Sequence, residues 1–267
     1  MEPFPGYRLR RRLGRGAFAE VWEALGRDGQ VLALKFLPCA DGPTTRQELR
    51  SLDAVRQLRH PNLVRIERVW CQPGYIVVAM ERAEASLLHL LEVAEADLGG
   101  PLVPEYACFL LAQAAAALDF LNTPQHRIHD HTLAVRHRDV KPSNLLLFGD
   151  TVKLTDFGLA YLTSSPMCAC PRAGTVEYSA PEVFHGRVST NTDQYALAVS
   201  YCHLRGGRLP FPDTPLDYDR RYVRPDPDLS MLPPRERPVV ARALAQRPEE
   251  RWSSCAAFME EVARSVM

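Results

Sequence analysis

Two short apolar segments joined by a two-residue turn place the strongest constraint on the fold of this chain. Residues 145–148 and 151–155 favour β-strands, and Gly149-Asp150 between them is typical of a tight antiparallel hairpin. The two ends of a hairpin lie side by side, so Asn144 before the first strand and Asp156 after the second are expected to be neighbours. A carboxylate and an amide oxygen at one place suit a divalent cation such as Mg²⁺.

The polar run that leads into this hairpin supplies a further carboxylate. It reads His137-Arg138-Asp139-Val140-Lys141-Pro142-Ser143-Asn144. We expect Asp139 on the same rim as Asn144 and Asp156, where it is free to act on a bound substrate.

A glycine pair near the N-terminus, Gly14 and Gly16, lies between two predicted strands. A dinucleotide or P-loop motif requires a helix directly after the glycines, whereas here the chain continues as strand. The pattern therefore favours a flexible hairpin over phosphate groups, although a plain turn is the commoner meaning of such a pair. Lys35 has two interpretations in the same way, a phosphate ligand or an outward-facing strand residue. The three strands are predicted at residues 7–13, 20–25 and 31–36.

These motifs occur together and in one order along the chain, with Asp156-Phe157-Gly158 and Ala180-Pro181-Glu182 at the end of the series. By this series of motifs the chain resembles the eukaryotic-type serine/threonine protein kinases, most of all their bacterial members. Lys141 and Gly174-Thr175 resemble the serine/threonine branch of the family and not the tyrosine branch. The resemblance covers residues 7–262, with an N-lobe at 7–80, a hinge at 81–83 and a C-lobe at 84–262.

That resemblance implies an α+β, two-lobed protein kinase-like fold, with a small antiparallel-sheet N-lobe that carries one main helix and a larger, mainly helical C-lobe. The helices are expected at residues 46–59, 104–122, 192–204, 237–245 and 255–264.

The resemblance also implies a role for each matching residue. Asp139 would accept the proton of the substrate hydroxyl with Lys141 beside it, and Lys35 would bind the α and β phosphates of ATP. Asn144 and Asp156 would hold Mg²⁺. The other residues implied to surround the nucleotide, with Met80 as gatekeeper, are Leu13, Gly14, Gly16, Val21, Ala33, Met80, Glu81, Ala83 and Leu146. Structural roles are implied for Asp193, which would tie down the catalytic loop, and for a pair between Glu182 and Arg251.

The helix-borne glutamate that pairs with the lysine in this family is displaced here. Counting back from His60-Pro61-Asn62 by the spacing usual in the family places the expected glutamate at position 51, which is Ser51 here. Glu48 lies one helical turn earlier, on nearly the same face of the helix. We therefore assign the pairing with Lys35 to Glu48, and expect Leu52 to supply the apolar side chain behind the active site. The alternative is that no ion pair forms, and that the protein is weakened or depends on a partner for activity.

A second departure is a long connection before the catalytic loop, which contains His126, His129 and His131. Three histidines could hold a metal ion. No cluster of cysteines or carboxylates supports them, so the sequence favours an exposed polar loop.

The activation segment is expected at residues 156–182. In the family, an arginine such as Arg138 often binds a phosphate on this segment, which predicts regulation by autophosphorylation. The predicted acceptors are Thr163, Ser164 and Ser165. Thr175 is expected to contact Lys141 and Asp139 instead of acting as a switch.

Composition agrees with one catalytic domain. The chain has 267 residues, of which 46% are hydrophobic and 24% charged, with seven scattered cysteines and a formal net charge of zero. The charge gives no reason to expect nucleic acid or membrane surfaces as partners. With no leader and no apolar run of membrane-spanning length expected, the simplest location is the cytoplasm. The resemblance leaves open that this is the cytoplasmic part of a longer membrane-anchored protein.

Two classes of function agree with these residues. The first is a signalling enzyme, an ATP- and Mg²⁺-dependent protein serine/threonine kinase that transfers the γ-phosphate to protein hydroxyls, with a dimer allowed for autophosphorylation in trans. The second is a pseudokinase or nucleotide-binding scaffold, which the displaced glutamate leaves open. A small-molecule kinase is disfavoured because residues 174–182 resemble the platform that receives a peptide.

Overall fold

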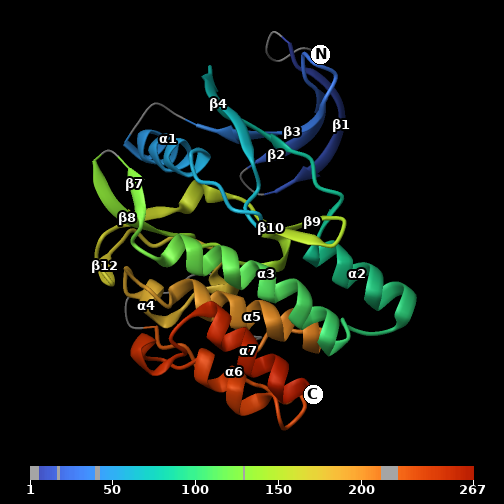
Figure 1. Ribbon diagram of the computed structural model, residues 1–267, viewed down its shortest axis with the longest axis vertical. Helices are drawn as coiled ribbons and strands as arrows, with labels where there is room; N and C mark the ends of the chain where they lie inside the picture. Colours follow the sequence, from blue (N-terminus) through green and yellow to red (C-terminus); the bar gives the residue numbers. More distant parts are fainter. Residues whose placement is uncertain (1–5, 17–18, 40–42, 129, 212–221) are drawn as a thin grey trace.

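The structure is a computed structural model, and it describes residues 6–16, 19–39, 43–128, 130–211 and 222–267. Within the first helix, the side chains of Pro43, Thr44, Arg46, Gln47, Glu48 and Arg50 are also outside the described part. A sheet-rich lobe that contains the N-terminus lies on a mainly helical lobe that contains the C-terminus (Figure 1). The predicted two-lobed fold is therefore confirmed.

The N-lobe is built on a five-stranded antiparallel sheet in the order β1-β2-β3-β5-β4. Its strands are β1 (Arg8–Arg15), β2 (Glu20–Leu25), β3 (Val31–Pro38), β4 (Ile66–Gln72) and β5 (Tyr75–Glu81). Lys35 lies in β3, paired with Val21 of β2 on one side and Val78 of β5 on the other. Pairing on both sides fixes the backbone from which the lysine side chain extends.

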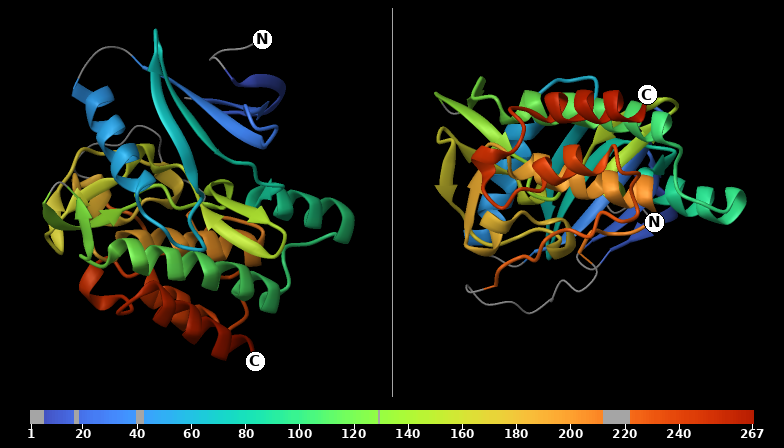
Figure 2. Two further views of the ribbon diagram at one scale, coloured as in Figure 1. Left: turned by 45° about the horizontal axis from the view of Figure 1, so that its top comes forward. Right: turned by 90° about the horizontal axis from the view of Figure 1, so that it is seen from below.

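Helix α1 (Pro43–Arg56) is the one main helix of this lobe. It contacts both β4 and the turn that follows Asp156, so it reaches from the sheet to the catalytic segment (Figure 2). Leu52 and Val55 are buried on its inner side. The helix begins and ends three residues before the predicted 46–59, and residues 57–59 lie outside it.

The C-lobe is organised around α3 (Pro104–Asn122), which packs against α5 (Thr192–Gly206), α7 (Cys255–Val266) and strand β10 (Thr151–Leu154). Helix α3 begins with a proline, which is favoured at the first helical position because its missing N–H has no partner there. Its inner face is fully buried, with Leu110, Ala114, Leu118 and Leu121 at 0% exposure. The helices are α2 (Leu87–Leu98), α3 (Pro104–Asn122), α4 (Pro181–Phe184), α5 (Thr192–Gly206), α6 (Arg237–Ala243) and α7 (Cys255–Val266).

The hairpin predicted from local sequence is confirmed. Strand β9 (Leu145–Phe148) pairs antiparallel with β10 (Thr151–Leu154), and β6 (Ala85–Ser86) pairs with the other edge of β9. The turn places Gly149 at φ 58°, a conformation that glycine adopts at little cost. At the open end, the Thr155 amide donates to the Asn144 carbonyl at 3.0 Å, so the two strand ends do lie side by side.

The prediction of an exposed polar loop before the catalytic loop is wrong. This segment forms a second hairpin, β7 (His126–Ile128) and β8 (His131–Arg136), and β8 pairs in turn with β11 (Tyr161–Thr163) of the activation segment. His126 is buried, because its ring packs on Phe120 and its Nε2 lies 2.8 Å from the Phe120 carbonyl oxygen. His129 lies outside the described residues. In the rest of the described chain, no group of three metal-ligating side chains is found.

Four more elements were not predicted from the sequence. Helix α2 is capped at both ends, by Ser86 accepting from the His89 amide and by Gly99 in the left-handed conformation. Strand β4 completes the N-lobe sheet, and β12 (Met167–Ala169) pairs with β13 (Arg187–Ser189). Among the described helices, none combines the length and the apolar character that crossing a bilayer requires.

Candidate active site

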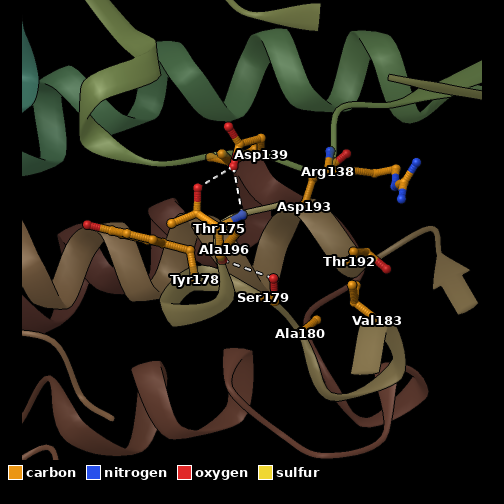
Figure 3. A pocket seen from close by; sticks show the side chains of 11 residues that line it. Arg138, Asp139, Thr175, Tyr178, Ser179, Ala180, Val183, Thr192, Asp193 and Ala196 are labelled. Carbon is orange, nitrogen blue, oxygen red and sulfur yellow. Dashed lines mark hydrogen bonds between the residues drawn. The ribbon is translucent and has the colours of Figure 1, made fainter. Parts of the chain in front are cut away.

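Asp139 is held by three side chains from separate points of the chain. Its Oδ1 accepts hydrogen bonds from the Thr175 amide at 3.0 Å and the Thr175 hydroxyl at 2.6 Å. The Lys141 ammonium lies 3.0 Å from Oδ2. Oδ2 also accepts a hydrogen bond from the side-chain Nδ2 of Asn144 at 2.9 Å. Figure 3 shows Asp139 and Thr175 facing each other, with Arg138 pointing away. The predicted contacts of Thr175 are all present.

These contacts set the charge of the carboxylate. Burial by itself would raise the pKa of Asp139, which is 8% exposed. The charge of Lys141 and the hydrogen bonds from Thr175 and Lys141 outweigh burial, with a smaller contribution from His137, and the pKa lies below its ordinary value. Asp139 is therefore ionised at neutral pH and can accept a hydrogen bond from an incoming hydroxyl.

The loop that carries Asp139 is tied to the centre of the C-lobe. The carboxylate of Asp193, at the start of α5, is fully buried and accepts from the amides of His137 at 2.9 Å and Arg138 at 2.8 Å. Arg138 has φ 71°, which is strained for a residue with a side chain, and the Asp193 bonds hold it there. The predicted tie between Asp193 and the catalytic loop is thus present.

Gly174 is needed at the point where the activation segment approaches this loop. Its φ is +113°, and a Cβ at this position would lie 2.5 Å from the Arg138 carbonyl oxygen. No other residue fits, because the neighbouring atom is backbone and cannot move aside. Glycine here allows the next residue, Thr175, to reach Asp139.

Asp156 and Lys35 meet across the two lobes. The Lys35 Nζ lies 2.6 Å from Asp156 Oδ1, and Asp156 adopts a left-handed backbone conformation with φ 68°. The Asp156 side chain is 31% exposed, so its carboxylate remains open to solvent on one side. Asn144 directs its Nδ2 to the Asp139 carbonyl and carboxylate, which leaves its amide oxygen to face a cation. This oxygen donor set fits Mg²⁺.

A small apolar cluster lies beside this polar rim, between the sheet and β9. It is formed by Val21, Ala33, Val64, Met80, Leu146 and Phe148. Four of these residues were implied to surround the nucleotide, and the structure brings them together from four strands. Such a wall suits the flat, apolar faces of a purine.

The other residues implied to surround the nucleotide lie at the end of β1, in the glycine loop and after β5. Leu13 and Gly14 lie at the end of β1, where Gly14 pairs with Val21, and Leu13 is 37% exposed. The Gly16 amide donates to the Ala19 carbonyl at 2.8 Å, which closes the described part of the glycine loop. Glu81 is the last residue of β5, and its carboxylate lies 2.8 Å from the Lys153 ammonium. Ala83 follows in irregular structure.

The side chain of Glu48 lies outside the described residues, so its assigned pairing with Lys35 stays a prediction. Ser51, one turn later, is 4% exposed, and its hydroxyl donates to the Ala160 carbonyl at 2.9 Å. Helix α1 is therefore joined directly to the segment that follows Asp156. The spacing before His60 pointed to Ser51 only as a position on the helix, and no sequence pattern indicated its partner Ala160.

Glu182 and Arg251 form the predicted buried pair. The Arg251 Nη1 and Nη2 donate to Glu182 Oε1 at 2.9 Å and Oε2 at 2.8 Å, and the two side chains are 0% and 7% exposed. Burial acts to raise the pKa of Glu182, but the hydrogen bonds and charge of Arg251 and the bond from Thr192 lower it overall. The pair fixes the end of the activation segment to the loop before α7.

The activation segment is ordered through its backbone. Arg138 donates to the carbonyl oxygens of Leu159, at 3.1 Å, and Pro171. Thr163 is buried and accepts from the Ser165 amide at 3.0 Å, whereas Ser164 and Ser165 are exposed. Arg224, which the sequence analysis did not select, also contacts this segment; a single arginine in a proline-rich stretch carries no motif that could have identified it.

The two lobes, the held carboxylate of Asp139 and the Lys35–Asp156 pair across them are the features of a protein kinase domain. Comparison with known families agrees: the family described as protein kinase domain matches residues 7–263, and the chain belongs to this family.

Similar proteins include CBL-interacting protein kinase 4 from Oryza sativa subsp. japonica, which is 33% identical over 270 residues, covering 94% of this chain and 56% of that protein. Serine/threonine-protein kinase PknD from Mycobacterium tuberculosis is 33% identical over 266 residues, covering 94% of this chain and 38% of PknD. Serine/threonine-protein kinase PkaA from Streptomyces coelicolor is 31% identical over 274 residues, covering 93% of this chain and 48% of PkaA. The chain thus spans between 38% and 56% of the length of these relatives.

Proposed function

We propose that this chain is a serine/threonine protein kinase, which transfers the γ-phosphate of ATP to serine or threonine hydroxyls of proteins. The observation that carries this proposal is the state of Asp139. Its carboxylate is ionised and held by Lys141 and Thr175, and it also accepts a hydrogen bond from Asn144, which together with Asp156 would hold the cation. A carboxylate so placed can orient an incoming hydroxyl and accept its proton.

The nucleotide roles follow from the chemistry of the site. Mg²⁺, when held by Asn144 and Asp156, offsets phosphate charge. Lys35 supplies a further positive charge from β3, and the apolar cluster that contains Ala33 and Met80 receives the adenine. Catalysis of phosphoryl transfer requires that the reactants are positioned and that the charge of the phosphates is neutralised, and these residues can perform both tasks.

Transfer to a protein hydroxyl is supported by Lys141 and Thr175, since both hold Asp139 at the edge of the segment that would receive a peptide. The printed names of PknD and PkaA describe serine/threonine-protein kinases. We take residues 7–262, divided at the hinge 81–83, as the catalytic unit. A cytoplasmic location, either of a separate protein or of the cytoplasmic domain of a longer membrane-anchored protein, is part of the proposal.

The direct test is phosphate transfer from Mg²⁺-ATP to a generic basic protein. The wild-type chain should transfer phosphate, and Asp139→Asn should lose about a hundredfold or more of this activity because the amide is no base. Nucleotide binding, measured by calorimetry, should be retained in D139N. Asp150→Asn is the matched control, because Asp150 is exposed at the β9–β10 turn. If the wild-type chain binds Mg²⁺-ATP but transfers no more phosphate than D139N does, the result would instead support a pseudokinase or nucleotide-binding scaffold.

Regulation by autophosphorylation belongs to the same proposal. Ser164 and Ser165 are exposed acceptors in the turn after β11, while Thr163 would have to leave its buried position first. Mass spectrometry of wild type incubated with Mg²⁺-ATP should find phosphate on residues 163–165, and D139N incubated alone should carry none. If the modification passes between two copies, wild type should phosphorylate D139N.

A further inference from the structure

A fully buried arginine lies against the end of the activation segment. Arg224 is 1% exposed and belongs to the largest fully buried side chains of the described residues, although its neighbour Val223 is 72% exposed. The backbone of Arg224 is held in place by Gln246, whose side-chain amide donates to the Arg224 carbonyl at 2.7 Å. Burying a guanidinium is costly, so the groups around it must compensate.

Aromatic rings surround this guanidinium. Its central carbon lies 4.1 Å from the centroid of Phe211, 5.3 Å from Phe184 and 5.9 Å from Tyr195. The faces of aromatic rings attract cations, and this attraction is strongest where water is excluded. The rings come from α4, α5 and the chain after α5, so Arg224 is held at the meeting point of three segments.

The guanidinium of Arg224 hydrogen-bonds to two backbone carbonyl oxygens and to the side chain of Tyr195. Nη1 donates to the Val176 carbonyl at 3.0 Å, and Nη2 donates to the carbonyl of the next residue, Glu177. Arg251, whose guanidinium carbon lies 4.9 Å from the centroid of the Tyr195 ring, differs in that it pairs with Glu182. The forked guanidinium therefore fixes two successive peptide planes, which a lysine with one point charge cannot do.

Those two carbonyls belong to the turn that begins at Thr175. The amide and hydroxyl of Thr175 both bind Oδ1 of Asp139, and the Tyr178 amide closes the turn on the Thr175 carbonyl at 3.0 Å. Arg224 thus holds the far side of a short turn whose near side holds the catalytic carboxylate.

We propose that Arg224 is a positioning residue for the protein substrate: by fixing residues 175–178, it sets where a substrate peptide lies relative to Asp139. This inference rests on the proposed kinase function and extends it, because it assigns control of peptide recognition to a residue that touches neither nucleotide nor acceptor hydroxyl. The nucleotide site is formed by other segments, so its affinity should be independent of Arg224.

Steady-state kinetics with a serine peptide, together with the slow hydrolysis of Mg²⁺-ATP by water, separates positioning from general stability. Arg224→Met keeps the bulk but removes both donors, and Arg224→Lys keeps the charge but loses the fork. Loss of two hydrogen bonds should raise the KM for peptide in R224M by about tenfold or more. In R224M the KM for ATP and the rate of hydrolysis should stay within about twofold, and R224K should lie between R224M and wild type.

Arg242→Met is the matched control, since Arg242 also stacks on an aromatic ring, Trp252 at 3.9 Å, but is exposed and belongs to α6. It should leave the KM for peptide unchanged. An unchanged KM for peptide in folded R224M would overturn the inference, as would equal losses in peptide and nucleotide parameters. If R224M fails to fold, R224K decides: wild-type peptide kinetics in R224K would assign Arg224 to the core alone. A wild type without any transfer would contradict the proposed function itself.

Discussion

The hydroxyl of Thr175 lies 2.6 Å from Oδ1 of Asp139 and 2.5 Å from the ammonium of Lys141, so one side chain of the activation segment bridges the Asp139 carboxylate and the Lys141 ammonium. The bridge links the segment that would receive a peptide to the group that would accept a proton. Its presence in this structure means that the segment is already placed against Asp139, with backbone contacts of Arg138 in support.

Replacing Thr175 by alanine should lower kcat for peptide phosphorylation. The hydroxyl donates to a charged group, and such a bond contributes about 1.5–3 kcal/mol, which corresponds to about a ten- to hundredfold loss. Thr175→Ser retains the hydroxyl and should keep most of the activity. Nucleotide affinity, measured by calorimetry, should change little in both. Equal activity of the alanine and serine variants would show that the bridge is not used.

Replacing Ser51 by alanine should weaken the connection between α1 and the segment after Asp156. The lost hydrogen bond leaves the buried Ala160 carbonyl unpaired, so the free energy of unfolding should fall by about 1–3 kcal/mol. Because Ala160 follows Asp156, which is proposed to hold Mg²⁺, the KM for Mg²⁺-ATP should rise as well. Ser200→Ala is the control: it is a buried serine that bonds within α5, to the Ala196 carbonyl. A normal KM in S51A would remove Ser51 from the site.

Arg251→Met should be among the most destabilising single changes. It leaves the Glu182 carboxylate buried without its partner, and breaking such a pair costs about 3–5 kcal/mol. Changing Glu182 to Gln in the same protein removes the unpaired charge and should restore part of the loss. Urea denaturation of the single and double variants measures both effects. A double variant less stable than R251M would contradict this account.

Acidification should destabilise the protein through Asp139 and Glu182. Both carboxyls have a lower pKa in the folded chain, so their contributions are fully present above the unfolded values, about 3.9 and 4.3, and are lost as the pH falls through the folded values. The free energy of unfolding should therefore decrease below about pH 5. E182Q should show a shallower decrease in the same range. An identical pH dependence in wild type and E182Q would assign the effect to other groups.

Replacing His126 by alanine should loosen the hairpin of β7 and β8. The change removes the buried contact between the His126 and Phe120 rings and the hydrogen bond to the Phe120 carbonyl. The backbone amides of β8, and those of β11 that pairs with β8, should therefore exchange faster with deuterium. His131→Ala is the control, because His131 is exposed at the start of β8. Unchanged exchange in β11 would show that the activation segment does not depend on this hairpin.

The sequence by itself determined the parts of the protein that depend on neighbouring residues. Gly149-Asp150 between two apolar runs specified the β9–β10 hairpin, and with it the approach of Asn144 to Asp156, because turn chemistry and strand propensity act over a few residues. The motif order then indicated the two lobes and the residues around Asp139. Helix α3 was predicted at the residues where it is found.

Only the tertiary structure decided which distant groups meet. The β7–β8 hairpin is stable because β11 and Phe120 cover it, Ser51 finds its acceptor 109 residues away, and Arg224 is buried among rings from three segments. The partners of β8, Ser51 and Arg224 lie beyond the span of a helix turn or a tight hairpin, so no local pattern records them. Burial and hydrogen bonding of such polar groups are properties of the packed chain, since each is favourable only when all of its partners are in place.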